Sequence, residues 1–165
     1  MSNYISPTSN VIDSRDVIER LDDLQEELDD LELAVSEAED ALADWEEPDE
    51  PDELADQEHE SLVEAVDSEK QKLNEWVNEY GEEYEALKAL DDDASGYCPD
   101  WRHGETLISE DYFTQYAQEM AHDIGAVDNN QSWPLNHIDW DSAAGARKED
   151  YNEIDYLGTT FLYRS

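Results

Sequence analysis

The stretch VIERLDDLQEELDDLELAVSEAEDALADW, residues 17–45, decides the fold of this chain. Its apolar residues follow one another at alternating spacings of four and three. That pattern has a period of 3.5 residues, which is typical of a coiled-coil seam. The positions between are mostly Asp and Glu, so we predict a long helix with an acidic outer surface. The predicted seam consists of Val17, Leu21, Leu24, Leu28, Leu31, Val35, Ala38, Leu42 and Trp45.

A second helix of the same kind follows after a short turn. Asp13 or Ser14 can cap the first helix, which we expect to end near residues 46–47 because Pro48 and Pro51 cannot continue it. Similar apolar spacing then runs from about residue 54 to residue 90, before the run DDDASG. A short tip between two long helices favours an antiparallel hairpin over residues 13–93. In that register Leu28 lies near Leu73 or Trp76.

The composition changes near residue 97, and we predict a small α+β domain over residues 97–165. Ser109 can cap a helix that ends before Gly125, and Asp139 can cap another over roughly residues 140–149. The last residues form two β-rich runs around Leu157–Gly158, which indicate a β-hairpin. Residues 1–12 are predicted to be a flexible lead-in. The expected fold class is therefore α+β, mostly α, with a helical hairpin followed by the small domain.

Charge is the strongest signal in the sequence. The chain has a net charge of −38, and residues 13–93 hold 34 of its 47 acidic residues with only five basic ones. Such a surface repels DNA, RNA and anionic membranes, and attracts proteins that bind polyanions. Like-charged pairs at i,i+4, such as Asp22 with Glu26, each cost about 0.2–0.5 kcal/mol in a helix. Local stability therefore does not explain these acidic residues.

The density of charge suggests imitation of a nucleic acid. About 33 residues of helix span roughly 50 Å, so the 29 net charges of residues 13–93 amount to about one per 1.7 Å, as in duplex DNA. We expect a non-enzymatic inhibitor that occupies the basic groove of a DNA- or RNA-binding host-defence protein. The predicted partner-binding residues are Asp22, Asp23, Glu26, Glu27, Asp29, Asp30, Glu37, Glu39, Asp40, Glu46, Glu47, Asp49, Glu50, Asp52, Glu53 and Asp56.

The same acidity has alternative interpretations. Adaptation to high salt also selects acidic residues, but it predicts even acidity, whereas the charge concentrates in residues 13–93. An acidic coiled-coil adaptor that binds a basic partner, such as a histone-like protein, is the alternative function. A homodimer is a further alternative, because a seam of period 3.5 pairs equally well within a chain or between chains.

No residue pattern points to catalysis, a cofactor or a metal. The four histidines do not fall into metal-ligand spacing with Cys98, the only cysteine, and no glycine-rich phosphate loop is present. We therefore expect no enzyme activity, no cofactor and no metal. The single cysteine, with no visible signal peptide or membrane segment, favours the cytoplasm of a bacterial host cell.

The last third of the chain resembles proteins of phages and plasmids. The segments are YFTQYAQEMAHDIGA (112–126), WP (133–134), IDWDSAAGARKEDY (138–151) and GTTFLYR (158–164). They are similar to the C-terminal part of ArdA-type antirestriction proteins, acidic DNA mimics that block restriction enzymes. The matching positions are Asp139–Trp140, Asp150–Tyr151 and Tyr163–Arg164. The acidic hairpin lies outside the ArdA pattern, so the resemblance leaves the target open between a restriction enzyme and another defence complex, such as a CRISPR effector.

Overall fold

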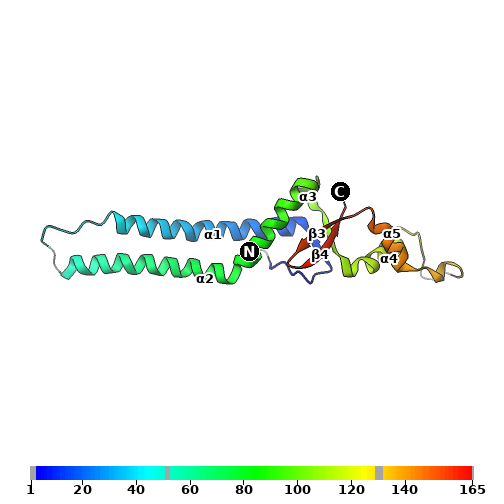
Figure 1. The fold of residues 1–165 in the computed structure, drawn as a ribbon, viewed down its shortest axis with the longest axis horizontal. Coiled ribbons are helices and arrows are strands. Elements are labelled where there is room, and N and C mark those ends of the chain that lie inside the picture. The colour runs from blue at the N-terminus through cyan, green and yellow to red at the C-terminus, as the bar shows by residue number, and fades with distance from the viewer. Residues whose placement is uncertain (1–2, 51–52, 129–131, 165) are drawn as a thin grey trace. The chain divides into compact units, whose positions relative to one another are not determined.

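The computed structural model describes residues 3–50, 53–128 and 132–164. The fold is α+β and mostly α-helical, as predicted (Figure 1). Its two long helices are α1 (Ser14–Ala43) and α2 (Glu53–Tyr97). In chain order the shorter elements are β1 (Val11–Asp13), α3 (Trp101–Gly104), β2 (Thr106–Ser109), the 3₁₀ helix η1 (Glu110–Tyr112), α4 (Phe113–Asp123), the 3₁₀ helix η2 (Leu135–His137), α5 (Trp140–Lys148), β3 (Asn152–Tyr156) and β4 (Thr159–Tyr163).

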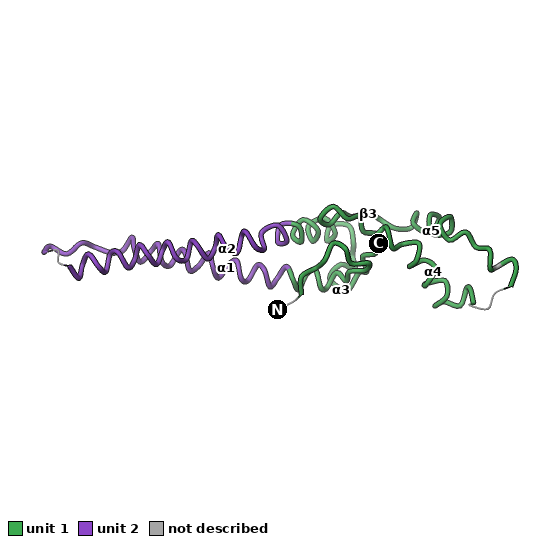
Figure 2. The backbone as a smooth tube through the Cα atoms, turned by 90° about the horizontal axis from the view of Figure 1, so that it is seen from below, with its two compact units in different colours: residues 1–20, 86–165 green, residues 21–85 purple. Residues whose placement is uncertain are grey.

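The chain folds into two compact units (Figure 2). The hairpin unit is residues 21–85, and the sheet unit is residues 1–20 together with residues 86–165. Helices α1 and α2 each contribute residues to both units. The division after residue 85 therefore differs from the domain boundary predicted between residues 93 and 97.

Within the hairpin unit, α1 and α2 run antiparallel. The Tyr84 hydroxyl of α2 donates a hydrogen bond to Gln25 Oε1 of α1. Further along, the Lys70 Nζ of α2 lies 2.6 Å from Glu39 Oε1 of α1. Partner numbers thus rise along α1 as they fall along α2, which confirms the predicted hairpin.

The predicted seam is the inward side of α1. Val17 and Leu24 are buried, and all nine seam positions are buried or half-buried. Most of the acidic residues between them are exposed. The period of 3.5 residues therefore identified the packed side of the helix correctly.

Helix α1 ends at Ala43, earlier than the predicted end near residues 46–47. Trp45 lies beyond the helix, and its ring centroid is 4.6 Å from that of His59. The end of a helix carries a partial negative charge, so Glu46 and Glu47 are unfavourable in a last turn. Ending at Ala43 leaves these two carboxylates in the tip between the helices.

Helix α2 continues past the predicted end near residue 90, through Asp91–Asp93, to Tyr97. Asp91 is half-buried and accepts a hydrogen bond of 2.6 Å from Nε1 of Trp101, which is 1% exposed. The acidic run therefore contains one carboxylate with a structural partner. That role was invisible in the sequence, because Trp101 follows the end of the helix.

Replacing Asp91 with alanine is expected to lower the free energy of unfolding by about 2 kcal/mol, because it removes a charged acceptor and leaves a buried indole N–H unpaired. Asp92 is the exposed neighbour, and its replacement with alanine serves as the matched control. We expect that control to change stability by less than about 0.5 kcal/mol. Chemical denaturation measures both variants, and equal effects would contradict the structural role of Asp91.

The described strands form one antiparallel sheet in the order β1-β2-β4-β3. Strands β3 and β4 are the predicted C-terminal hairpin, in which Tyr156 lies opposite Thr159. The two turn residues between them have positive φ, 49° at Leu157 and 79° at Gly158. Two successive residues with positive φ are typical of the type I′ turn, whose twist suits a two-residue hairpin.

Strands β1 and β2 were not predicted, and the expectation of a flexible lead-in over residues 1–12 does not hold at its end. Residues 11–12 belong to β1, and Ile12 is 5% exposed. Ile5 is also buried, and its carbonyl accepts a hydrogen bond of 2.9 Å from the Tyr156 hydroxyl. Strands of three and four residues are too short to show an alternating pattern, and each partner is distant in sequence.

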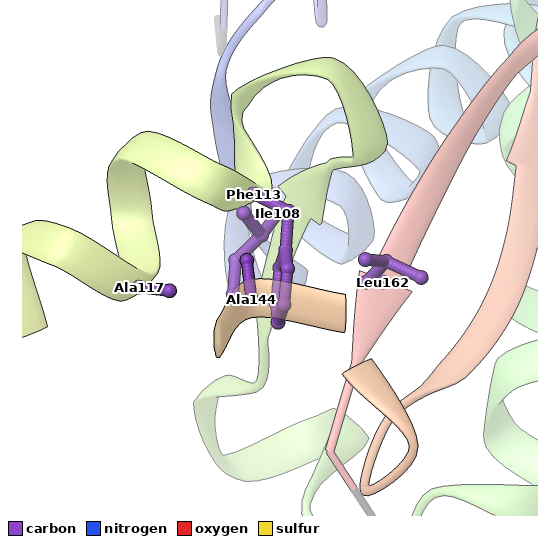
Figure 3. Packing of buried hydrophobic residues seen from close by; sticks show 5 residues of the cluster. All are labelled: Ile108, Phe113, Ala117, Ala144 and Leu162. Atoms are coloured by element: carbon purple, nitrogen blue, oxygen red, sulfur yellow. The ribbon is translucent and has the colours of Figure 1, made fainter. Parts of the chain in front are cut away.

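Helices α4 and α5 contact the sheet through a small apolar cluster. Ile108 of β2 and Leu162 of β4 are paired in the sheet and pack with Phe113 and Ala117 of α4 and Ala144 of α5 (Figure 3). Alternate residues of a strand point to opposite faces, so Ile108 and Leu162 lie on the face of the sheet that contacts α4 and α5. The small Ala117 and Ala144 belong to helices that pack against each other.

The predicted ends of these two helices are largely confirmed. Asp139 Oδ1 accepts a hydrogen bond of 3.1 Å from the Ser142 backbone N–H, which caps α5. Gly125 has φ of 72° just past α4, the left-handed conformation expected there. Ser109 makes no side-chain capping bond in the described structure, because η1 lies between it and α4.

Candidate functional site

The predicted partner-binding carboxylates lie almost entirely on the surface of the hairpin unit. Asp23 and Glu27 are half-buried, and Asp52 lies outside the described residues. The remaining thirteen are exposed: Asp22, Glu26, Asp29, Asp30, Glu37, Glu39, Asp40, Glu46, Glu47, Asp49, Glu50, Glu53 and Asp56.

Regular spacing places part of this set on one side of α1. Asp22, Glu26 and Asp29 are three or four residues apart, and Glu37 and Asp40 continue the same line two turns later. Residues at these spacings lie above one another on a helix. The helix therefore arranges these carboxylates as a row on its solvent side.

Two of the predicted residues also hold the hairpin together. Glu27 Oε2 accepts a hydrogen bond of 3.1 Å from Nε1 of Trp76, which is 7% exposed. Glu39 pairs with Lys70, and that hydrogen bond raises the pKa of the lysine. Exposed pairs of this kind stabilise by about 0–1 kcal/mol, so the buried indole makes Glu27 the more structural of the two.

The charged residues of the hairpin unit are almost all acidic. Residues 21–85 contain 28 acidic and two basic residues, a net charge of −26, whereas the sheet unit has 19 acidic and seven basic residues, a net charge of −12. Both lysines of the hairpin unit are paired, since Lys70 contacts Glu39 and Lys72 contacts Glu69 at 2.7 Å. The surface therefore presents carboxylates with little compensating positive charge.

The length of the hairpin unit sets its charge density. Residues 53–85 of α2 span about 50 Å at a rise of about 1.5 Å per residue. A net charge of −26 over that length is about one charge per 1.9 Å, close to the value of about 1.7 Å for duplex DNA. The structure thus keeps the density that the sequence predicted.

Cys98 does not have the environment of a nucleophile. It is buried, and its Sγ lies 3.8 Å from Glu105 Oε2, to which the thiol donates a hydrogen bond. Burial raises the pKa of the thiol, and the neighbouring Glu105 carboxylate raises it further. Because the thiolate is the reactive form, these surroundings disfavour the form in which a cysteine acts as a nucleophile.

Other chemical features are sparse in the described part of the chain. Residues 3–50, 53–128 and 132–164 contain no group of three His, Cys, Asp or Glu side chains arranged to hold a metal ion. His59 contacts the ring of Trp45, and His122 has its ring centroid 6.3 Å from that of Trp140. None of the described helices has the length and apolar character needed to cross a membrane.

The residues that carry the ArdA resemblance have packing and capping contacts in the sheet unit. Asp139 caps α5, and Asp150 Oδ2 lies 2.7 Å from Arg147 Nη1. Tyr151 meets the ring of Phe113 edge-on at 4.9 Å. Tyr163 is buried, which raises the pKa of its hydroxyl. These contacts give most of the motif a structural role.

Comparison with models of protein families, with curated protein sequences and with solved structures found no match for this chain.

Proposed function

We propose that the hairpin unit imitates the charged surface of a nucleic acid and inhibits a DNA- or RNA-binding defence protein. The target is a restriction enzyme or a CRISPR effector, and the inhibitor occupies its basic groove without enzymatic activity. The proposed place of action is the cytoplasm of a bacterial cell that carries a phage or another mobile element. The observation that carries the proposal is a net charge of −26 on residues 21–85.

The position of the carboxylates supports this role. A protein that binds DNA gains affinity when its Lys and Arg side chains release counterions from closely spaced phosphates. The hairpin unit offers anionic groups at nearly the same linear density, and thirteen of the predicted carboxylates are exposed. Helices α1 and α2 hold nine of these thirteen carboxylates, so the backbone at these nine positions loses little conformational entropy on binding.

The repulsion between acidic residues of α1 also supports the proposed function, because it destabilises the helix. Asp22, Glu26 and Asp30 are exposed and follow one another at i,i+4 on α1. Like charges at that spacing destabilise a helix by about 0.2–0.5 kcal/mol per pair. Substitution by lysine at one of these positions would relieve the repulsion, so the acidic residues serve something other than the stability of α1.

A competition experiment tests the proposal. The immobilised full chain is exposed to a bacterial lysate at about 50 mM salt, where electrostatic binding is strong, and bound protein is eluted with duplex DNA or structured RNA. The eluted protein is then purified, and its DNA or RNA binding is titrated with the full chain. We expect the apparent dissociation constant for nucleic acid to rise in proportion to inhibitor concentration, with the maximal signal unchanged.

Two results would contradict this function. If the captured partner stays bound to the chain in saturating DNA and RNA, the hairpin is an adaptor for a basic protein rather than a mimic. If the purified partner binds nucleic acid equally well with and without the chain, its groove is not occupied.

A further inference from the structure

A groove of about 550 Å³ lies within the hairpin unit, lined by α1 and α2. The apolar residues lining it include Leu28 of α1 and Leu73, Trp76 and Tyr84 of α2. Val77 also lines it and is 50% exposed. The sequence predicted Leu28 near Leu73 or Trp76, and all three line this groove. It did not predict a groove beside these residues.

Gly81 leaves part of this groove empty. It lies within α2, where glycine is less favourable than any residue except proline. A Cβ atom at this position would lie 3.4 Å from Cγ1 of Val77, an ordinary van der Waals contact. Alanine therefore fits and would favour the helix, yet the chain has glycine, which keeps the groove open beside Val77.

The edges of the groove identify the charge of its occupant. Glu32, Glu82 and Glu85 line it and are exposed, and among the described residues its lining includes neither lysine nor arginine. Nucleic acids and anionic lipids are repelled by these carboxylates. A second copy of the hairpin unit brings its own net charge of −26 and is repelled as well. The complementary occupant is a basic polypeptide with apolar side chains.

The length of the groove identifies the shape of that polypeptide. Its lining on α2 extends from Leu73 to Glu85, which is about 18 Å along the helix axis. A third helix of about twelve residues matches that length, and an amphipathic helix laid into an apolar groove is a common mode of recognition.

We propose that this groove binds a basic amphipathic helix of the target protein. Apolar side chains of that helix contact Leu28, Leu73 and Val77, while its Lys and Arg residues face Glu32, Glu82 and Glu85. The inference rests on the proposed function for the identity of the target, and it adds an apolar contact that a phosphate backbone does not make. Binding through the groove therefore persists at salt concentrations that screen the carboxylates.

Two synthetic peptides and two substitutions test the proposal in the full chain. One peptide is a lysine–leucine helix with its leucines on one face, and the other has the same composition in an order without an apolar face. Gly81→Leu fills the groove, and Gly81→Ala is the control that favours the helix while adding one methyl group. Calorimetric titrations are carried out at about 0.1 M salt, where the Debye length is about 10 Å, and at about 0.5 M salt, where it is well below 10 Å.

We expect the amphipathic peptide to bind the parent chain at least about tenfold more tightly than the scrambled peptide at about 0.5 M salt, since burying one leucine is worth that much. Gly81→Leu is expected to remove this difference in affinity between the two peptides. It should leave binding of the scrambled peptide at about 0.1 M salt unchanged. Gly81→Ala should keep most of the difference in affinity between the two peptides. Its melting temperature should rise, which would show that this variant stays folded.

Three results would overturn the groove proposal. Both peptides binding the parent chain equally at about 0.5 M salt would show that the groove adds nothing. If the amphipathic peptide still binds Gly81→Leu more tightly than the scrambled peptide does, the apolar contact lies outside the groove. A parent dimer that Gly81→Leu dissociates, measured by sedimentation, would make a second copy the occupant. The two proposals are tested separately. If DNA and RNA do not displace the captured partner, the mimic function is wrong, whereas the peptide titrations still decide whether the groove binds a basic amphipathic helix.

Discussion

Neutralising ten exposed carboxylates of the hairpin unit is expected to stabilise the protein at low salt and to weaken its binding to the target strongly. The substitutions are Asp to Asn and Glu to Gln, so side-chain volume hardly changes. Glu27 and Glu39 are left out because they contact Trp76 and Lys70. The ten positions are Asp22, Glu26, Asp30, Glu37, Asp40, Glu46, Glu47, Asp49, Glu50 and Asp56.

The gain in stability comes from lost repulsion. Several like-charged pairs at i,i+3 and i,i+4 disappear, at about 0.2–0.5 kcal/mol each, for a total of about 1–3 kcal/mol. Thermal unfolding at low salt measures this gain. In about 1 M salt, where the Debye length is about 3 Å, parent and variant should differ little. A variant no more stable than the parent at low salt would mean that these carboxylates do not repel one another.

The loss of binding comes from the same ten groups. Exposed ion pairs contribute about 0.2–1 kcal/mol each, so ten of them contribute about 2–10 kcal/mol. The dissociation constant for the DNA-displaceable partner should therefore rise by at least about 30-fold. An unchanged constant would refute the role of the carboxylates.

A matched pair of smaller variants separates position from total charge. One variant neutralises five positions on α1, and the other neutralises five exposed positions of the sheet unit, giving the same net charge. Only the α1 variant is expected to bind the partner markedly more weakly, whereas equal weakening would point to net charge alone. The α1 set is Asp22, Glu26, Asp30, Glu37 and Asp40, and the sheet-unit set is Asp100, Asp111, Asp123, Asp141 and Glu149.

Replacing Ser14 with alanine is expected to destabilise the sheet unit strongly. Ser14 is 0% exposed, and its Oγ donates a hydrogen bond of 2.6 Å to the Trp101 carbonyl. The same oxygen accepts one of 2.7 Å from the Glu105 backbone N–H. Alanine removes both bonds and leaves a buried donor and acceptor unpaired, at about 1–3 kcal/mol each. We expect a loss of about 2–4 kcal/mol in the free energy of unfolding.

Ser36 offers the matched control for this substitution. It is exposed in the same helix, and alanine there should be neutral or slightly stabilising, because alanine is the best helix former. Urea denaturation followed by circular dichroism measures both variants. If Ser14→Ala costs less than about 0.5 kcal/mol, the size of an ordinary surface substitution, then Ser14 does not hold α1 to the Trp101–Glu105 region.

Ser14 has a role that depends on distant parts of the chain. The sequence offered Asp13 or Ser14 as the cap of α1, and Asp13 Oδ1 accepts the capping bond of 2.9 Å from the Arg15 backbone N–H. Ser14, next to it, instead bonds to residues 87 and 91 positions away. Nothing in the local sequence distinguishes these two roles, because a cap depends on neighbours and a buried bond depends on the distant chain.

In the candidate site, too, some features could be predicted from the local sequence and others depend on the tertiary structure. Exposure of Asp22 and Glu26 was predictable, since both lie off the apolar seam of α1. The partnership of Glu27 with Trp76 was not, because it depends on the register between two helices. The groove beside Gly81 was also missed, because a glycine in a helix shows a gap only once the neighbouring side chains are placed.

By itself the sequence determined the two long helices, the acidic surface and the C-terminal β-hairpin, and it favoured the antiparallel pairing of the helices. These features depend on periodicity, proline and glycine positions and charge, all of which act between residues close in the chain. Only the tertiary structure decided the partners of β1 and β2, the hydrogen bonds of Ser14 and Asp91, and the open groove. Each of these depends on contacts between distant segments, which no local pattern records.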